Sequence, residues 1–118
     1  MRPDSIRQVI DTSDAQGRKT YLHSILDSIL VERERQDARH GEATERGYSL
    51  YRWVTVLAEE VGEVAEAVQD TPVPIRENMT EWMGLYTELI HVAAVAVAMA
   101  EVVLDEAKKE DHEDRPRT

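Results

Sequence analysis

The chain has 118 residues, a formal net charge of −10 and no cysteine. This length is that of one small domain, the lack of cysteine excludes disulfides and thiolate metal sites, and the acidic balance argues against a basic face that grips a nucleic-acid backbone. Phenylalanine is absent, and glycine and proline are sparse, so the composition favours helix. We expect an all-α protein of a reducing compartment, the cytoplasm, that binds neither nucleic acid nor membrane.

The first predicted helix follows a loosely ordered N-terminal segment, residues 1–20, which is polar and contains no apolar run typical of a signal peptide. From residue 22 the apolar residues recur at helical spacing. They are Leu22, Ile25, Leu26, Ile29 and Leu30. The helix is expected to continue through charged residues to Arg39 and to stop at Gly41.

A second helix is predicted after a polar loop over residues 41–48, with Ser49 in position to cap it. Its apolar residues alternate four and three apart. They are Leu50, Val54, Leu57, Val61, Val64 and Val68. The run from Asp70 to Pro74 ends the helix, because proline lacks the amide hydrogen and restricts the residue before it.

Asn78 and Glu81 form a weak capping signature for a third helix. This helix is apolar on nearly every face in its centre, but its most apolar stretch, residues 90–104, is too short and too rich in alanine to span a bilayer. Two partner helices do not cover such a surface. We therefore expect residues 21–107 to form a helical bundle completed by homo-oligomerisation, as a homodimer or tetramer, and residues 108–118 to form a charged flexible tail.

The second and third predicted helices each carry an acidic element beside their apolar residues. Residues three and four apart share one face of a helix, so Glu59, Glu60 and Glu63 converge on the second helix, and Glu88 and His91 converge on the third. Glu60 and Glu88 each lie three residues after one apolar seam residue and four before the next, which points both carboxylates toward the bundle interior or its rim. An unpaired carboxylate there costs on the order of several kcal/mol, so the pattern predicts a divalent cation between them.

A solvated helical face is the alternative interpretation of each acidic element by itself, because glutamate-rich helices are common. Two such elements, each beside an apolar seam and separated by a turn, favour the metal site. Glu66 is left outside the predicted site.

Residues 57–67, Leu-Ala-Glu-Glu-Val-Gly-Glu-Val-Ala-Glu-Ala, are followed by residues 88–98, Glu-Leu-Ile-His-Val-Ala-Ala-Val-Ala-Val-Ala. Together they resemble the MazG-like, all-α nucleoside triphosphate pyrophosphohydrolases, in particular the small forms carried by phages. The upstream residues 34–41, Glu-Arg-Gln-Asp-Ala-Arg-His-Gly, are also similar to a segment of those small forms. The resemblance spans about residues 29–101.

The resemblance implies Mg²⁺-dependent hydrolysis of a (deoxy)nucleoside triphosphate to monophosphate and pyrophosphate, a housekeeping reaction of the nucleotide pool. By position, it implies that Glu59, Glu60, Glu63 and Glu88 are metal ligands, with Glu59 or Glu63 also drawing the proton from the attacking water. The fifth expected ligand is His91, where most of the family has aspartate. A neutral imidazole is a poor ligand for Mg²⁺ and a better one for Mn²⁺, so this position makes Mn²⁺ the alternative cofactor.

Candidate substrate-binding residues lie at the end of the first helix and the start of the second. The basic residues in reach of a phosphate are Arg35, Arg39, Arg46 and Arg52. Of these, Arg39 and Arg52 are expected to contact phosphate, and Trp53 is expected to stack on a base. The alternatives are ordinary surface arginines and a core tryptophan, because tryptophan at helical spacing is more often buried.

Two other functions fit part of the pattern. One is a helical interaction module that keeps the fold without catalysis, with His91 as the sign of lost chemistry. The other is a di-metal carboxylate bundle, because Glu88-x-x-His91 is an element that such bundles use in pairs, and a dimer would supply the second copy.

Overall fold

A computed structural model describes residues 17–113 of the chain, with side chains from residue 21 onward. This part of the chain forms three long helices, α2 (Gly17–His40), α3 (Leu50–Gln69) and α4 (Met79–Glu113), and two single-turn 3₁₀ helices, η1 (Ala43–Glu45) and η2 (Ile75–Glu77). No strand occurs in these residues, and the predicted all-α class is confirmed. Most of the expected loose N-terminal segment, residues 1–16, and the last residues of the expected tail, 114–118, lie outside the described range.

The predicted boundaries of α2 and α3 follow from local chemistry. Gly41 has a φ of 87°, and its backbone N–H donates to the carbonyl of Asp37 at 2.8 Å, which ends α2 where the sequence indicates. The hydroxyl of Ser49 accepts a hydrogen bond from the backbone N–H of Arg52 at 3.2 Å, which confirms the predicted cap of α3.

Helix α4 is longer than the sequence predicts. It continues to Glu113, so residues 108–113 of the expected flexible tail are helical. Lys109 explains part of this extension, because its Nζ lies 3.2 Å from the Asp105 carboxylate and 3.6 Å from that of Glu106, at spacings that support a helix. Helix α2 likewise begins at Gly17, inside the segment expected to be loosely ordered.

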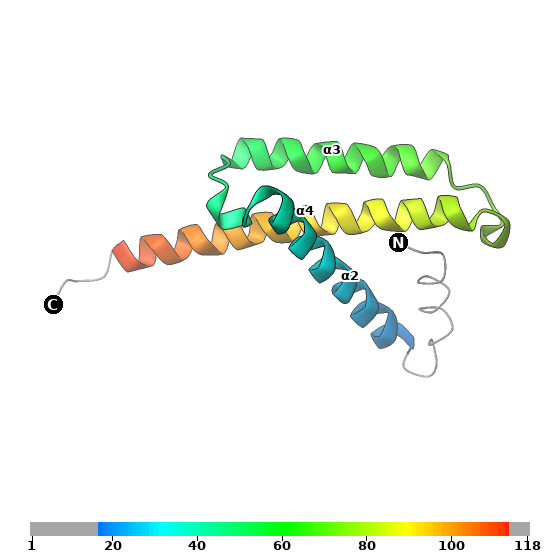
Figure 1. Cartoon of the computed structure of the whole chain (residues 1–118), viewed down its shortest axis with the longest axis horizontal. Coiled ribbons are helices and arrows are strands. Elements are labelled where there is room, and N and C mark those ends of the chain that lie inside the picture. The colour runs from blue at the N-terminus through cyan, green and yellow to red at the C-terminus, as the bar shows by residue number, and fades with distance from the viewer. Residues whose placement is uncertain (1–16, 114–118) are drawn as a thin grey trace.

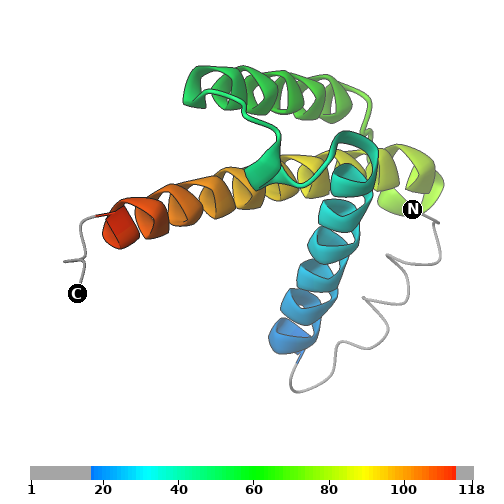
Figure 2. The same cartoon turned by 60° about the vertical axis from the view of Figure 1, so that its left-hand side comes forward.

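Helices α2 and α3 both pack against α4 (Figure 1). Helix α3 lies alongside α4 and runs in the opposite direction, whereas α2 crosses α4 at a steep angle (Figure 2). The core lies where η1 and the start of α3 meet α4, and its buried members are Ala43, Trp53, Val95 and Ala98. The antiparallel pair α3 and α4 is the frame that carries the two acidic elements.

A buried ion pair fixes α2 on α4. Arg33 is 5% exposed, and its guanidinium contacts the Glu101 carboxylate of α4 at 2.8 Å and the Asp37 carboxylate of α2 at 2.9 Å. Two carboxylates on one buried guanidinium give directional, charge-assisted hydrogen bonds. This contact sets the position of the α2 residues next to Arg33.

Much apolar surface stays uncovered on the single chain. Leu22, Leu26 and Leu30 of α2 are each more than half exposed, and α4 exposes Leu89, Val97, Val103 and Leu104. Helix α4 also contains an 18-residue window with a mean hydropathy of 1.8, of which 22% is buried. By length and composition alone α4 is therefore apolar enough to cross a membrane, in contrast to the expectation that its apolar stretch is too short. The central helix of an oligomeric bundle has the same composition.

Candidate metal centre

Four side chains from α3 and α4 converge on one point. They are Glu60, Glu63, Glu88 and His91, and each offers a ligand atom that lies within 4.8 Å of the other three. The antiparallel packing of α3 on α4 sets the two pairs opposite one another, and the spacing of three residues within each pair places both members on one face. The structure thus brings together four of the five predicted metal ligands.

Two carboxylate oxygens in this cluster are buried without a hydrogen-bond partner in the described part of the chain. They are Oε2 of Glu60 and Oε2 of Glu88. The imidazole of His91 lies beside both oxygens, with Nδ1 3.7 Å from the first and 3.4 Å from the second. Buried carboxylate oxygens without partners are costly, and a divalent cation satisfies both at once.

The raised pKa values of Glu60 and Glu88 also support a cation at this position. Burial raises the pKa of Glu60, the nearby Glu63 and Glu88 charges raise it further, and His91 opposes them. Burial also raises the pKa of Glu88, and the close Glu63 carboxylate adds to the effect against an opposing influence of His91. Both residues are thus poorly solvated acids that would gain from a cation.

The other two predicted glutamates, Glu63 and Glu59, lie at different positions relative to the cluster. Glu63 is exposed at the rim of the cluster and still belongs to it. Glu59 is exposed on α3 and is not part of the group. It lies about 100° around the helix from Glu60 and one helical turn before the exposed Glu63. The structure therefore does not bring Glu59 to the site where the sequence places it.

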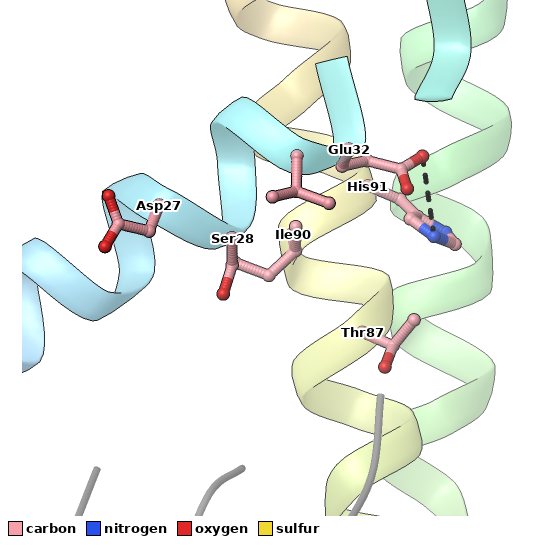
Figure 3. A pocket seen from close by; sticks show the side chains of 7 residues that line it. Asp27, Ser28, Glu32, Thr87, Ile90 and His91 are labelled. Atoms are coloured by element: carbon pink, nitrogen blue, oxygen red, sulfur yellow. Dashed lines mark ion pairs between the residues drawn. The ribbon is translucent and has the colours of Figure 1, made fainter. Parts of the chain in front are cut away.

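Glu32 of α2 reaches the site, and the sequence analysis missed it. Its side chain is only 10% exposed, and Oε2 lies 3.7 Å from Nε2 of His91 (Figure 3). Arg35 donates to its two oxygens at 2.7 Å and 2.6 Å, and Gln36 donates at 3.0 Å. Burial by itself would raise the pKa of Glu32, but these hydrogen bonds and the His91 charge lower it overall.

The spacing of α2 contained a signal for Glu32. This residue follows Ile29 by three and Ile25 by seven, so it lies on the apolar face that packs toward α4. The same reasoning identified Glu60 and Glu88 on their helices.

Two cavities adjoin the acidic cluster. The first, of about 340 Å³, lies between α2 and α4, and Figure 3 shows Glu32 and His91 in its wall. Its lining is Asp27, Ser28, Val31, Glu32, Thr87, Ile90 and His91. The second, of about 510 Å³, lies between α3 and α4 and is lined by Glu63, Glu66, Ala67, Asp70, Glu81, Gly84 and Glu88.

The three predicted substrate-binding residues lie away from both cavities. Trp53 is 1% exposed and belongs to the core, next to Tyr48. The guanidinium of Arg52 lies over the Tyr48 ring, 3.7 Å from its centroid, and Arg39 is exposed on the last turn of α2. None of the three lines either cavity beside the cluster.

Comparison of the chain with protein-family models, with curated proteins and with solved structures finds no match in any of the three.

Proposed function

We propose that this protein hydrolyses (deoxy)nucleoside triphosphates to monophosphate and pyrophosphate with the help of a divalent cation. The observation that carries the proposal is a pair of buried oxygens, one on Glu60 and one on Glu88, that have no hydrogen-bond partner among residues 17–113. Both face the same imidazole nitrogen within a cluster of four potential ligands. The resemblance of residues 57–67 and 88–98 to MazG-like pyrophosphohydrolases supplies the substrate class.

The donor set fits a hard or borderline cation. Glu60, Glu63 and Glu88 would supply carboxylate oxygens, and His91 would supply Nδ1. Carboxylates suit Mg²⁺ and Mn²⁺, while the imidazole shifts the preference toward Mn²⁺. When bound, such a cation neutralises triphosphate charge and favours in-line attack by water.

Among the glutamates of the cluster, Glu63 suits the role of general base. It is exposed at the rim, so solvent water reaches its carboxylate, whereas Glu60 and Glu88 are half-buried. In this proposal the carboxylate accepts a proton from the attacking water while the water oxygen bonds to the α- or the β-phosphorus. The P–O bond that joins the α- and β-phosphates breaks, and monophosphate and pyrophosphate separate. This assignment replaces the earlier choice between Glu59 and Glu63, because Glu59 lies outside the cluster.

The cavity between α2 and α4 supports a small organic substrate at this site. Its volume of about 340 Å³ falls in the range of small-molecule pockets, and His91 belongs both to its wall and to the acidic cluster. Ser28 and Thr87 add hydroxyl groups to a wall that also contains Val31 and Ile90. Such a mixture of apolar surface and a few polar groups suits the base and sugar of a nucleotide.

Arg35 is the basic residue that the geometry favours as a phosphate contact. Its guanidinium is about half exposed and holds Glu32, and the Glu60 charge contributes to raising its pKa, which indicates that it lies near the cluster. Arg39 and Arg52 lack such a link to the site.

The test is a screen of nucleoside triphosphates with Mg²⁺ and with Mn²⁺, with the products separated by chromatography. We expect monophosphate and pyrophosphate to appear together from at least one substrate, and the reaction to stop with a chelator. Stepwise appearance of diphosphate and orthophosphate would contradict the proposal.

A second candidate is a di-metal carboxylate bundle, because Glu88 and His91 of the Glu-x-x-His element both belong to the cluster. This candidate predicts iron in the purified protein and absorption in the near ultraviolet. A protein that binds Mn²⁺ but hydrolyses no nucleotide would favour the inactive interaction module.

A further inference from the structure

We infer that Glu32 is a positioning residue for His91: it biases the imidazole proton toward Nε2 and so turns the lone pair of Nδ1 toward Glu60 and Glu88. The inference rests on the proposed function, because the placement of Nδ1 matters for activity only if His91 binds a metal ion. It concerns the contact between Glu32 of α2 and His91 of α4. Glu32 lies outside the two acidic elements of α3 and α4.

The Glu32 carboxylate is held in a fixed orientation as a hydrogen-bond acceptor. Arg35 grips both of its oxygens at 2.7 Å and 2.6 Å, Gln36 donates to Oε2 at 3.0 Å, and the residue is 8% exposed. A carboxylate held by a guanidinium in this way has a defined orientation and only accepts hydrogen bonds. The buried Arg33, next to it in the chain, ties this part of α2 to α4.

The two nitrogens of the His91 ring face different partners. Nε2 lies 3.7 Å from Oε2 of Glu32, and Nδ1 lies 3.4 Å and 3.7 Å from Oε2 of Glu88 and Glu60. A neutral imidazole has one donor and one acceptor nitrogen, so the carboxylates on its two sides compete for its proton. Glu88 is nearer to the ring than Glu32, so in the metal-free protein Glu32 shifts this balance toward a proton on Nε2 without completing the shift. A cation held by Glu60 and Glu88 would remove their competition for the proton and leave the Nδ1 lone pair free to bind it.

This arrangement is the carboxylate–histidine–metal order of many metal sites, in which an outer carboxylate fixes the ring and raises its basicity. The 3.7 Å separation is longer than a hydrogen bond. We expect it to shorten when Nδ1 binds a cation, because Nε2–H then becomes a stronger donor. Loss of such an outer partner typically weakens metal affinity about 10- to 100-fold.

The test variant is Glu32→Gln, which keeps the size of the side chain, and its control is Glu34→Gln, the same charge change at an exposed position of the same helix. Arg35 is 53% exposed, so water replaces its lost ion pair and the fold is expected to survive. Calorimetric titration with Mn²⁺ should show a loss of affinity of about tenfold or more for Glu32→Gln and little change for Glu34→Gln.

A double-mutant cycle distinguishes an effect of Glu32 on the orientation of His91 from an effect of the Glu32 charge alone. In the His91→Asp background there is no imidazole to orient, so Glu32→Gln should no longer weaken Mn²⁺ binding. An equal loss in both backgrounds would overturn the inference, because Glu32 would then act only through its charge.

The tautomer of His91 gives a readout that needs no metal. Nitrogen-15 correlation spectra of the metal-free protein, recorded about two pH units above the ordinary imidazole pKa of about 6.5, report which ring nitrogen carries the proton. The signals are assigned by their absence in His91→Asp. We expect the Nε2-protonated fraction to fall in Glu32→Gln and to stay constant in Glu34→Gln.

An unchanged tautomer in Glu32→Gln overturns the inference. If the wild-type protein binds no Mn²⁺, the proposed function fails instead, and the tautomer comparison still decides whether Glu32 positions His91.

Discussion

Nδ1 of His91 lies 3.7 Å from Oε2 of Glu60, an oxygen that is buried without a hydrogen-bond partner in the described residues. The two residues come from the antiparallel helices α4 and α3. This approach joins the two acidic elements into one group and defines where a cation would sit.

Replacement of a cluster carboxylate should strongly lower turnover. We expect Glu60→Gln and Glu88→Gln to lower the metal-dependent rate of triphosphate hydrolysis by at least about a hundredfold, because each removes an anionic oxygen from the donor set. Initial rates at saturating Mn²⁺ measure the effect.

The matched control for these variants is Glu59→Gln, the exposed neighbour of Glu60. It should retain nearly full activity. A loss as large as that of Glu60→Gln would return Glu59 to the role that the sequence predicts for it.

The metal-free protein should lose stability as the pH rises. Glu60 and Glu88 have pKa values above the ordinary 4.5, so the folded state holds their protons more tightly than the unfolded state does. Their contribution to the free energy of unfolding is full below 4.5 and is lost as the pH rises through the raised values. Urea unfolding in the presence of a chelator, repeated over a series of pH values, measures this slope.

Glu60→Gln isolates the contribution of one group to this slope. The variant should gain stability relative to the wild type as the pH rises above 4.5, because it has no charge to bury. Glu32 has the opposite sign: its pKa is lowered, so its contribution is present above 4.5 and is lost as the pH falls through the lowered value. A constant difference between wild type and Glu60→Gln across the series would contradict the buried-acid interpretation.

The metal preference should respond to His91→Asp. This change replaces Nδ1 with a hard, anionic oxygen, so Mg²⁺-supported activity should rise relative to Mn²⁺-supported activity. The ratio of the two rates is the measurement. His91→Ala is the control, because it removes the ligand without a substitute and should weaken binding of both cations; equal titration curves for all three proteins would place His91 outside the metal coordination sphere.

Trp53 should prove to be a core residue. Trp53→Leu should lower the free energy of unfolding by roughly 2–4 kcal/mol, because it leaves a cavity among Ala43, Val95 and Ala98. The KM for a nucleotide should stay unchanged. Tyr51→Leu is the exposed control at 88% exposure and should change neither quantity; a raised KM in Trp53→Leu at unchanged stability would instead support base stacking.

The protein should be a homodimer or tetramer in solution. Exposed leucines of α2 and the exposed apolar residues of α4 leave more apolar surface than soluble monomers usually show, and a second copy would cover it. Light scattering of the detergent-free protein at micromolar concentration should give at least twice the chain mass of 13.5 kDa.

A charge on the apolar face of α2 should disrupt this assembly. Leu26→Glu is expected to lower the mass toward that of one chain, whereas Val73→Glu, at a residue that is 78% exposed in the turn before η2, should not. A monomeric wild type would contradict the expected oligomer, and a wild type that is insoluble without detergent would favour membrane insertion of α4.

The helices and their ends were largely predictable because their signals are local. Gly41 ends α2 through its own backbone angle, and Ser49 caps α3 through a bond to a residue three positions away. The end of α4 differs from the prediction, because the charged composition of residues 108–118 favours a flexible tail, whereas α4 continues to Glu113. Lys109 and Asp105 instead form a pair within the helix.

The sequence alone determined that Glu60 and Glu88 border the apolar seams of their helices. The spacing of the apolar residues in the sequence and the helical period together define each seam. It did not determine that Glu59 falls outside the cluster, since neighbouring residues on a helix diverge by about 100° and only the packing angle selects between them. Nor did it determine that Glu32 faces His91. That contact depends on the steep crossing of α2 over α4, which Arg33 and Glu101 hold in place across a long stretch of chain, and such long-range packing is decided only when the tertiary structure forms.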